Sequence, residues 1–155
     1  MKNSTLARGI ATVAACALGL AALGSAKNPV ERPFKIHATA TWVVSLADGS
    51  AVGEQVGEAT HSGRFTDEAV GSWDLSTFTL ISASGVATGA NGYQVFWELP
   101  GSSFAVEWTG GTGRFENLTG GFNIVSQSEP EVGPGPLPGT ITITATYTGA
   151  GTSTY

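Results

Sequence analysis

Two long segments of this chain alternate between apolar and polar residues. From 34 to 46 every even position is apolar or small, whereas most odd positions carry polar side chains. From 140 to 148 threonine occupies every even position, and the odd positions begin with Ile141, Ile143, Ala145 and Tyr147. A period of two residues predicts a strand with one buried and one solvated face. Threonine is β-branched and suits the solvated face of such a strand.

Turn signals divide the chain between these two segments. Asn91 followed by Gly92 indicates a tight hairpin, and Pro100 followed by Gly101 indicates another turn. Helical periodicity is almost absent. The pattern predicts further strands near 56–66, 72–83, 85–90, 92–99, 103–109 and 113–127.

About eight antiparallel strands joined by short turns fit an all-β fold, either a sandwich or a closed barrel. The interior of an eight-stranded barrel can be filled by side chains or can hold one small ligand. We expect residues 27–155 to form this single domain.

Two segments near the end of the chain break the strand pattern. Residues 128–139 contain four prolines and two glutamates, which predicts an extended acidic loop, because proline cannot donate to a sheet ladder. A solvated connector is the preferred interpretation of this loop, with a lid over the barrel mouth as the alternative. The glycine-containing segment 149–155 is expected to be a loose tail.

Residues 1–26 have the composition of a cleaved signal peptide. Lys2 and Arg8 precede a short apolar stretch that ends in small residues, with cleavage expected after Ala26. The stretch is too short to favour a membrane-spanning helix, so the mature form is expected to have no integral membrane span. Cys16 follows a sequence that resembles a lipobox, but a second apolar run comes after it. Secretion or release into the periplasm is therefore favoured over lipid anchoring through Cys16.

The charge and the cysteine count narrow the functional classes. Loss of Lys2 and Arg8 leaves five basic residues against twelve acidic ones, a formal charge of −7. This charge opposes binding to nucleic acid and to anionic lipid. Cys16 is the only cysteine, so the mature domain forms no disulfide.

Metal or cofactor binding is not expected from the residue pattern. His37 and His61 lie on different predicted strands, and the acidic residues lack the spacing of a calcium loop. The chain also lacks a phosphate loop, a dinucleotide fingerprint and a nucleophile elbow.

The glycine-rich run 110–120 resembles a motif of the allene oxide cyclase and dirigent barrel superfamily. Members carry Gly-Gly-Ser/Thr-Gly-x-Phe before a further glycine, within an eight-stranded antiparallel barrel. The matching residues here are Gly110, Gly111, Thr112, Gly113, Phe115 and Gly120. Segments 58–65 and 90–96 also look like uncharacterised exported bacterial relatives of that barrel.

The resemblance implies a barrel cavity that takes hydrophobic small molecules. Because the plant members are commonly oligomeric, it also makes a homo-oligomer an option. The polar functional residues of the plant members have no assignable counterpart in this sequence, so their activity is not carried over.

Five aromatic residues fall on predicted inner faces and are the first candidates for ligand contacts. They are Trp42, Tyr93, Trp97, Trp108 and Tyr147. Indoles in a small barrel are most simply core residues, but they also suit the wall of a site for a flat or apolar ligand.

His61 is the one ionisable side chain that strand alternation places on an inner face, within the predicted strand 56–66. A structural role is favoured over a ligand contact. The same rule places Glu98, Glu107 and Arg114 outside. An interior without acids and bases is a poor site for proton transfer.

These observations predict an exported soluble β-barrel that binds a small apolar molecule without catalysis. One alternative is a cyclase- or isomerase-like enzyme that uses the cavity and His61. The other is a structural or surface-interaction protein whose barrel is packed solid.

Overall fold

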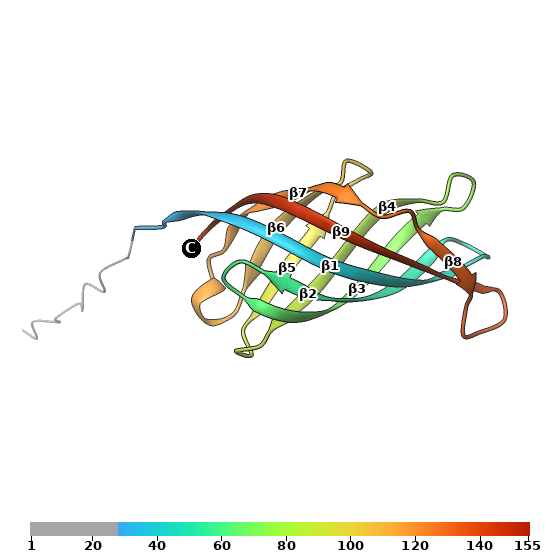
Figure 1. Ribbon diagram of the computed structural model, residues 1–155, viewed down its shortest axis with the longest axis horizontal. Helices are drawn as coiled ribbons and strands as arrows, with labels where there is room; N and C mark the ends of the chain where they lie inside the picture. The colour runs from blue at the N-terminus through green and yellow to red at the C-terminus, as the bar shows by residue number, and fades with distance from the viewer. Residues whose placement is uncertain (1–27) are drawn as a thin grey trace, which may run out of the picture.

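The computed structural model describes residues 28–155, so the predicted signal peptide and Cys16 lie outside the described residues. Within that range the chain is almost entirely strand, with one short 3-10 helix (Figure 1). The elements are β1 (Glu31–Ser45), β2 (Ser50–Ala59), β3 (Gly63–Asp74), β4 (Thr79–Gly89), β5 (Gln94–Leu99), β6 (Ala105–Gly111), η1 (Gly113–Phe115), β7 (Thr119–Gln127), β8 (Glu131–Pro134) and β9 (Thr140–Thr154).

Pairing of the first and last strands closes the sheet into a barrel. Neighbours follow the order β1-β2-β3-β4-β5-β6-β7-β9, all antiparallel, and β9 pairs with β1 along its whole length, from Glu31 opposite Thr154 to Ser45 opposite Thr140. The predicted antiparallel barrel of about eight strands is therefore confirmed. β8 is an additional short strand that pairs with the first residues of β9, Ile141–Thr144.

Two predicted strands are each interrupted by a turn. The segment 56–66 contains the turn 60–62 between β2 and β3, where Ala59 pairs with Gly63. The segment 72–83 contains a turn in which the Asp74 carboxylate accepts hydrogen bonds from the Ser76 backbone N–H and hydroxyl. Side-chain hydrogen bonding of this kind makes a turn without glycine or proline at its centre.

The glycine-rich segments also differ from the prediction. The segment 113–127 begins with η1, and only its later part forms β7. The expected loose tail 149–155 is wrong, because β9 continues to Thr154 and pairs there with both β1 and β7. A Cβ atom at Gly149 would lie 2.4 Å from the Phe122 ring, so this glycine gives space to an aromatic side chain.

The proline-rich segment 128–139 contains a strand that the sequence did not predict. Among the strands of residues 28–155, β8 pairs only with Ile141–Thr144 of β9, and its other edge has no partner strand there. Proline is tolerated on such an edge strand, because its missing N–H need not face a neighbour.

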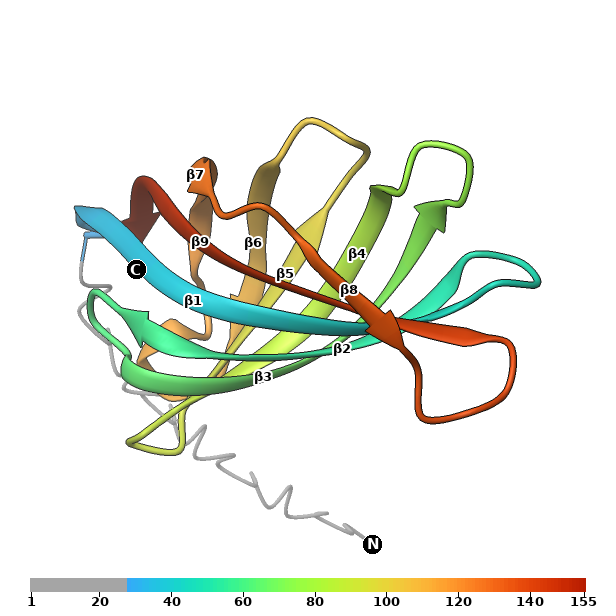
Figure 2. The same ribbon diagram turned by 45° about the vertical axis from the view of Figure 1, so that its right-hand side comes forward.

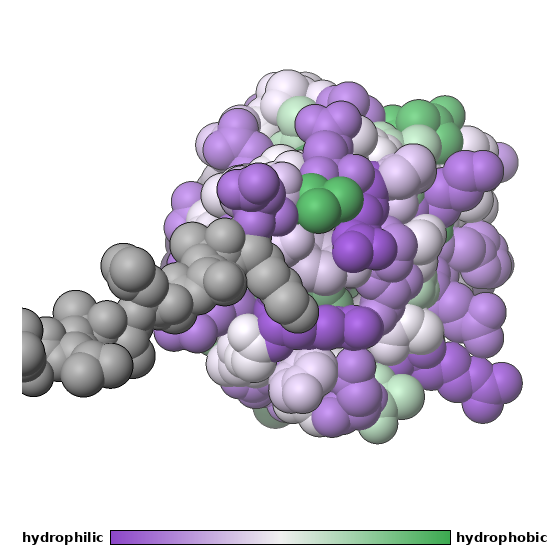
Figure 3. Space-filling view, turned by 90° about the vertical axis from the view of Figure 1, so that its left-hand side faces the viewer, coloured by the Kyte–Doolittle hydropathy of each residue, from purple (hydrophilic) through white to green (hydrophobic). Residues whose placement is uncertain are grey.

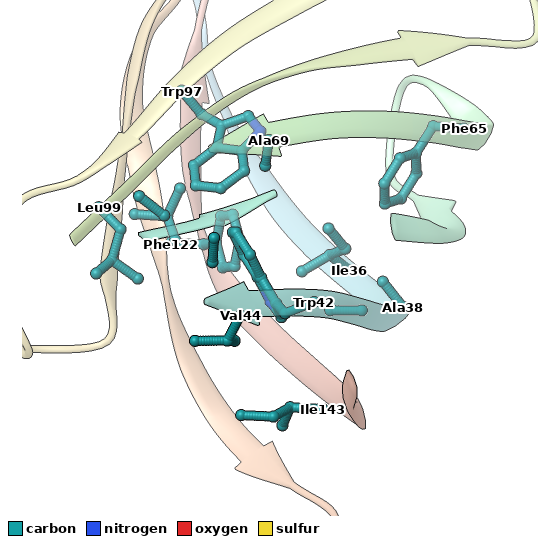
Figure 4. Packing of buried hydrophobic residues seen from close by; sticks show 14 of the residues in the cluster. Ile36, Ala38, Trp42, Val44, Phe65, Ala69, Trp97, Leu99, Phe122 and Ile143 are labelled. Atoms are coloured by element: carbon teal, nitrogen blue, oxygen red, sulfur yellow. The ribbon is translucent and has the colours of Figure 1, made fainter. Parts of the chain in front are cut away.

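Inward side chains stack in rings across the strands, and large residues alternate with small ones. One ring pairs Trp42, Gly53, Ala69, Gly85 and Trp97 in register across β1 to β5. A Cβ at Gly53 would lie 2.6 Å from the Trp42 ring, and one at Gly85 would lie 2.6 Å from the Trp97 ring. The two indoles therefore lie over glycines of the neighbouring strands, within the core that Figure 4 shows.

Candidate ligand-binding cavity

The barrel contains a cavity of about 210 Å³ with a mostly apolar wall. Its largest wall residues are aromatic: Phe34, Trp42, Trp73, Trp97, Trp108 and Phe122. An apolar cavity of about 150 Å³ accommodates benzene, so this one has room for one ring with a short chain. The alternative of a core packed solid does not agree with this space.

Asp67 on β3 brings a carboxyl group into the cavity wall. The side chain is 5% exposed, and its Oδ2 accepts a hydrogen bond from the Trp97 indole N–H at 2.5 Å. It lies between Phe65 and Ala69 on the inner face of β3. The expectation of an interior without acids is therefore wrong. Continuing the alternation of Phe65 past residue 66, where the predicted strand ended, would have identified Asp67.

The surroundings of Asp67 disfavour its charged form. Burial raises the pKa of this carboxyl to about 7, the Trp97 hydrogen bond lowers it, and the neighbouring charge of Glu68 raises it further. Among the described residues that line the cavity there is no lysine or arginine. An ionised Asp67 therefore has no cationic side chain beside it within the cavity wall.

Gln55 and Tyr147 extend the polar part of the wall. Gln55 pairs in register with Asp67 across β2 and β3, and the Tyr147 hydroxyl donates a hydrogen bond to its Oε1 at 2.6 Å. Burial raises the pKa of Tyr147 well above its usual value, and the charge of Asp67 contributes. Tyr147 is therefore a neutral hydrogen-bonding phenol at physiological pH.

Four buried polar atoms of the wall have no hydrogen-bond partner within residues 28–155. They are Asp67 Oδ1, Trp73 Nε1, Trp108 Nε1 and Ser153 Oγ. Most buried polar groups in proteins have a partner. These four atoms are therefore exceptions, and all four belong to residues of the cavity wall.

Four of the six candidates from the sequence line the cavity from inner strand faces, namely Trp42, Trp97, Trp108 and Tyr147. Tyr93 precedes β5, is exposed, and packs its ring against Gly113 and Phe115 outside the cavity wall.

His61 contacts one end of the cavity from the β2–β3 turn, with a left-handed φ of 75°. Its Nε2 lies 3.1 Å from the Pro33 carbonyl oxygen, and its ring meets Tyr155 edge-on. The sequence predicted that His61 lies on the inner face of a strand, but the structure places it in a turn.

The barrel end where Val30 and Tyr155 meet is plugged. Phe115 is 2% exposed and Leu118 is also buried, and both contact this end of the cavity. Arg114 packs over the Phe115 ring and donates a hydrogen bond to the His61 carbonyl oxygen. The surface visible at this end is mostly hydrophilic (Figure 3).

Two phenylalanines mark the opposite end. Phe78 in the β3–β4 loop and Phe104 before β6 both line the cavity, and they are 53% and 43% exposed. Their loops lie on the same side of the barrel (Figure 2). Both residues have left-handed backbone, with φ of 52° and 55°, which is unusual for bulky side chains and is associated with functional sites. These residues form an apolar, solvent-exposed rim of the cavity.

No family model matches the chain, and neither curated proteins nor solved structures gave a match. Within residues 28–155 no helix is long and apolar enough to cross a membrane. The same range holds no group of three or more His, Cys, Asp or Glu side chains placed to bind a metal.

Proposed function

We propose that this protein is an exported, soluble β-barrel that binds a small, largely apolar molecule in its cavity without catalysis. The observation that carries the proposal is a cavity of about 210 Å³ whose wall residues include four with a buried polar atom that has no partner among residues 28–155. An apolar ligand body gains about 0.8 kcal/mol for each CH₂ removed from water, while a few polar groups fix its orientation.

Two further parts of the proposal rest on the sequence. Export rests on the predicted signal peptide at 1–26, and membership of the allene oxide cyclase and dirigent barrel superfamily rests on the motif at 110–120.

A cavity-filling variant tests the proposal. Ala87 points into the cavity from β4, and its neighbour Val86 is exposed on the same strand. We expect the purified protein to bind an environment-sensitive apolar dye, Ala87→Phe to lose that binding, and Val86→Phe to keep it. Failure of folded wild-type protein to bind the dye or any of a panel of single-ring compounds would overturn the proposal.

A second candidate, a cyclase- or isomerase-like enzyme, is favoured by Asp67 alone. A carboxyl group with a pKa of about 7 in an apolar cavity is suited to take up and release a proton near neutral pH. Once a turnover is found, comparison of Asp67→Asn with His61→Ala shows which side chain it needs. Activity that survives both changes would remove this candidate mechanism.

A further inference from the structure

One carboxylate oxygen of Asp67, a residue of the cavity wall, has no hydrogen-bond partner among residues 28–155. Asp67 is 5% exposed and lines the cavity, and its Oδ2 accepts a hydrogen bond from the Trp97 indole, whereas its Oδ1 has no partner in the described part of the chain. When Asp67 is ionised, a neutral donor such as a hydroxyl group at Oδ1 leaves the buried negative charge without compensation. A cation supplies both the hydrogen bond and the opposite charge, which is the usual arrangement for buried ions.

The cavity walls next to Asp67 are aromatic. Asp67 lies two residues from Ala69 on β3, so the carboxyl is one ring of side chains along the barrel from Trp42 and Trp97. Trp73 packs edge-on against Trp42, with ring centroids 6.3 Å apart. Indole faces attract cations, and the attraction grows when the cation is removed from water.

The net negative charge of the whole chain also favours a cationic ligand. The twelve acidic residues outnumber the basic ones, and the formal charge is −5 even with the predicted signal peptide included. An acidic protein concentrates small cations near its surface and repels anions.

We infer that the ligand of this cavity is a small organic amine, whose ammonium group binds Asp67 Oδ1 and whose apolar body lies against the indoles. This inference rests on the proposed binding function and names its ligand class. The cavity of about 210 Å³ limits the ligand to about one aromatic ring with a short aminoalkyl chain.

Matched probes separate an amine from other ligands of the same size. The probes are 2-phenylethylammonium, its alcohol analogue 2-phenylethanol, and propylbenzene, which has no polar group. Calorimetric titration of the purified protein at pH 8 is expected to show the amine binding at least about tenfold more tightly than the alcohol.

Two variants test whether the preference depends on the buried carboxylate. Asp67→Asn keeps an acceptor for the Trp97 N–H and is expected to lose the preference for the amine while it still binds the alcohol. Glu68→Gln removes a negative charge from the exposed face of the same strand and is expected to keep the preference.

The pH dependence supplies an independent readout. The titratable groups that line the cavity are Asp67 on β3, Tyr147 on β9 and His61 in the β2–β3 turn, and Glu68 is the charged neighbour that acts on Asp67. Protonation of Asp67 removes the charge that the amine needs, so lowering the pH from 8 to 5.5 is expected to weaken amine binding at least about tenfold and alcohol binding little. The same dependence is expected in His61→Gln.

The outcomes distinguish this inference from the function on which it rests. Equal binding of the amine and the alcohol to wild type and Asp67→Asn would overturn the amine inference and leave the binding function intact. Binding of propylbenzene but of neither polar probe would also overturn the amine inference and leave the binding function intact. If folded wild-type protein binds none of the three probes, both proposals fail for ligands of this size.

Discussion

One residue changes the chemistry of this barrel. An interior lined only by aromatic and aliphatic side chains would sort molecules by shape and apolar surface, whereas Asp67 adds a titratable acceptor beside an indole donor. Gln55 pairs with Asp67 and is hydrogen-bonded to Tyr147, so these three residues form a polar patch in an otherwise apolar wall.

Asp67 makes the stability of the protein depend on pH in a direction opposite to that of a salt-bridged aspartate. Burial raises its pKa from 3.8 to about 7, so the folded state holds the proton more tightly than the unfolded state. Below pH 3.8 both states are protonated, and the ionisation of Asp67 costs no stability. Between pH 3.8 and 7 the free energy of unfolding falls by up to ~4 kcal/mol, and above pH 7 the full loss remains.

Asp67→Asn lacks this titration. We therefore expect its stability relative to wild type to increase from pH 4 to pH 7 and then to level off, as measured by urea unfolding at pH 4, 5.5, 7 and 8. Glu68→Gln is the control on the outer face. A difference between Asp67→Asn and wild type that stays constant across these pH values would contradict the assignment of Asp67 as a buried, uncompensated acid.

Gly85 is needed because the Trp97 indole lies directly over it. A Cβ at Gly85 would approach the ring to 2.6 Å, whereas a Cβ at Gly133 on β8 would meet nothing within 4 Å. Gly85→Ala is expected to displace the indole, weaken its bond to Asp67 and lower the free energy of unfolding by about 1–3 kcal/mol. Gly133→Ala is the matched control, and thermal and urea unfolding compare the two. Equal effects of both changes would show that Trp97 can move at no cost.

At the scale of elements, the sequence predicted the fold class better than the strand boundaries. The alternation at 34–46 and 140–148 identified the two strands whose pairing closes the barrel. In the segment 56–66 the alternation continues in phase through the turn at 60–62, so periodicity alone could not reveal the hairpin. The same error ended the predicted strand at 66 and hid Asp67.

Glycine can indicate either a flexible segment or close packing between strands, and the sequence alone did not distinguish the two. In the tail 149–155 glycine suggested flexibility, but Gly151 lies against the backbone of Gly121 and Phe122 on β7. Only the partner strand shows that this glycine serves close packing. The inner placement of Trp42, Trp97, Trp108 and Tyr147 was predictable, because alternation is a local property; the hydrogen bonds among them and their neighbours were not, because they join distant strands.

β9 and the short strand β8 differ in importance for the barrel, and proline substitutions can show this. Thr152 pairs with Pro33 of β1 on one side and with Gly121 of β7 on the other, so its N–H faces a partner strand in either orientation. Thr152→Pro is expected to cost about 3 kcal/mol or more.

Val132 on β8 provides the comparison. Gly135 donates its N–H to the Thr140 carbonyl, and because bonded pairs alternate along an antiparallel ladder, the N–H of Val132 points away from β9. Val132→Pro is therefore expected to change stability by less than about 1 kcal/mol. Urea unfolding of both variants measures the contrast. A larger loss for Val132→Pro would show that β8 is a required part of the barrel.

At the scale of the whole molecule, the two ends of the barrel differ. The end at Val30 and Tyr155 is closed by Phe115 and Leu118, and the opposite end presents Phe78 and Phe104 to solvent. A ligand is therefore expected to reach Asp67 past the two phenylalanines.

Val30 and Tyr155 meet at the plugged end, which allows the order of the strands within residues 28–155 to be changed without changing the barrel. The backbone N–H of Val30 donates to the Tyr155 carbonyl oxygen, with 3.4 Å between nitrogen and oxygen, so a short flexible linker can join the two ends of a protein that consists of residues 28–155. New termini between Leu137 and Pro138, in the exposed β8–β9 loop, break no strand. We expect this permutant to unfold within about 1 kcal/mol of wild type and to bind the apolar dye, because exposed loops tolerate new termini.

A second permutant opened between Glu116 and Asn117 tests the plug itself. This connection holds buried Phe115 and Leu118 through backbone hydrogen bonds from Phe115 to Thr112 and from Leu118 to Phe115. Opening it frees both side chains from their fixed positions, so we expect lower stability and weaker dye binding than in the first permutant. Circular dichroism, urea unfolding and dye titration compare the two proteins. Equal stability and equal binding would show that the cavity does not need this end to be closed, and access from both ends would then replace access past Phe78 and Phe104.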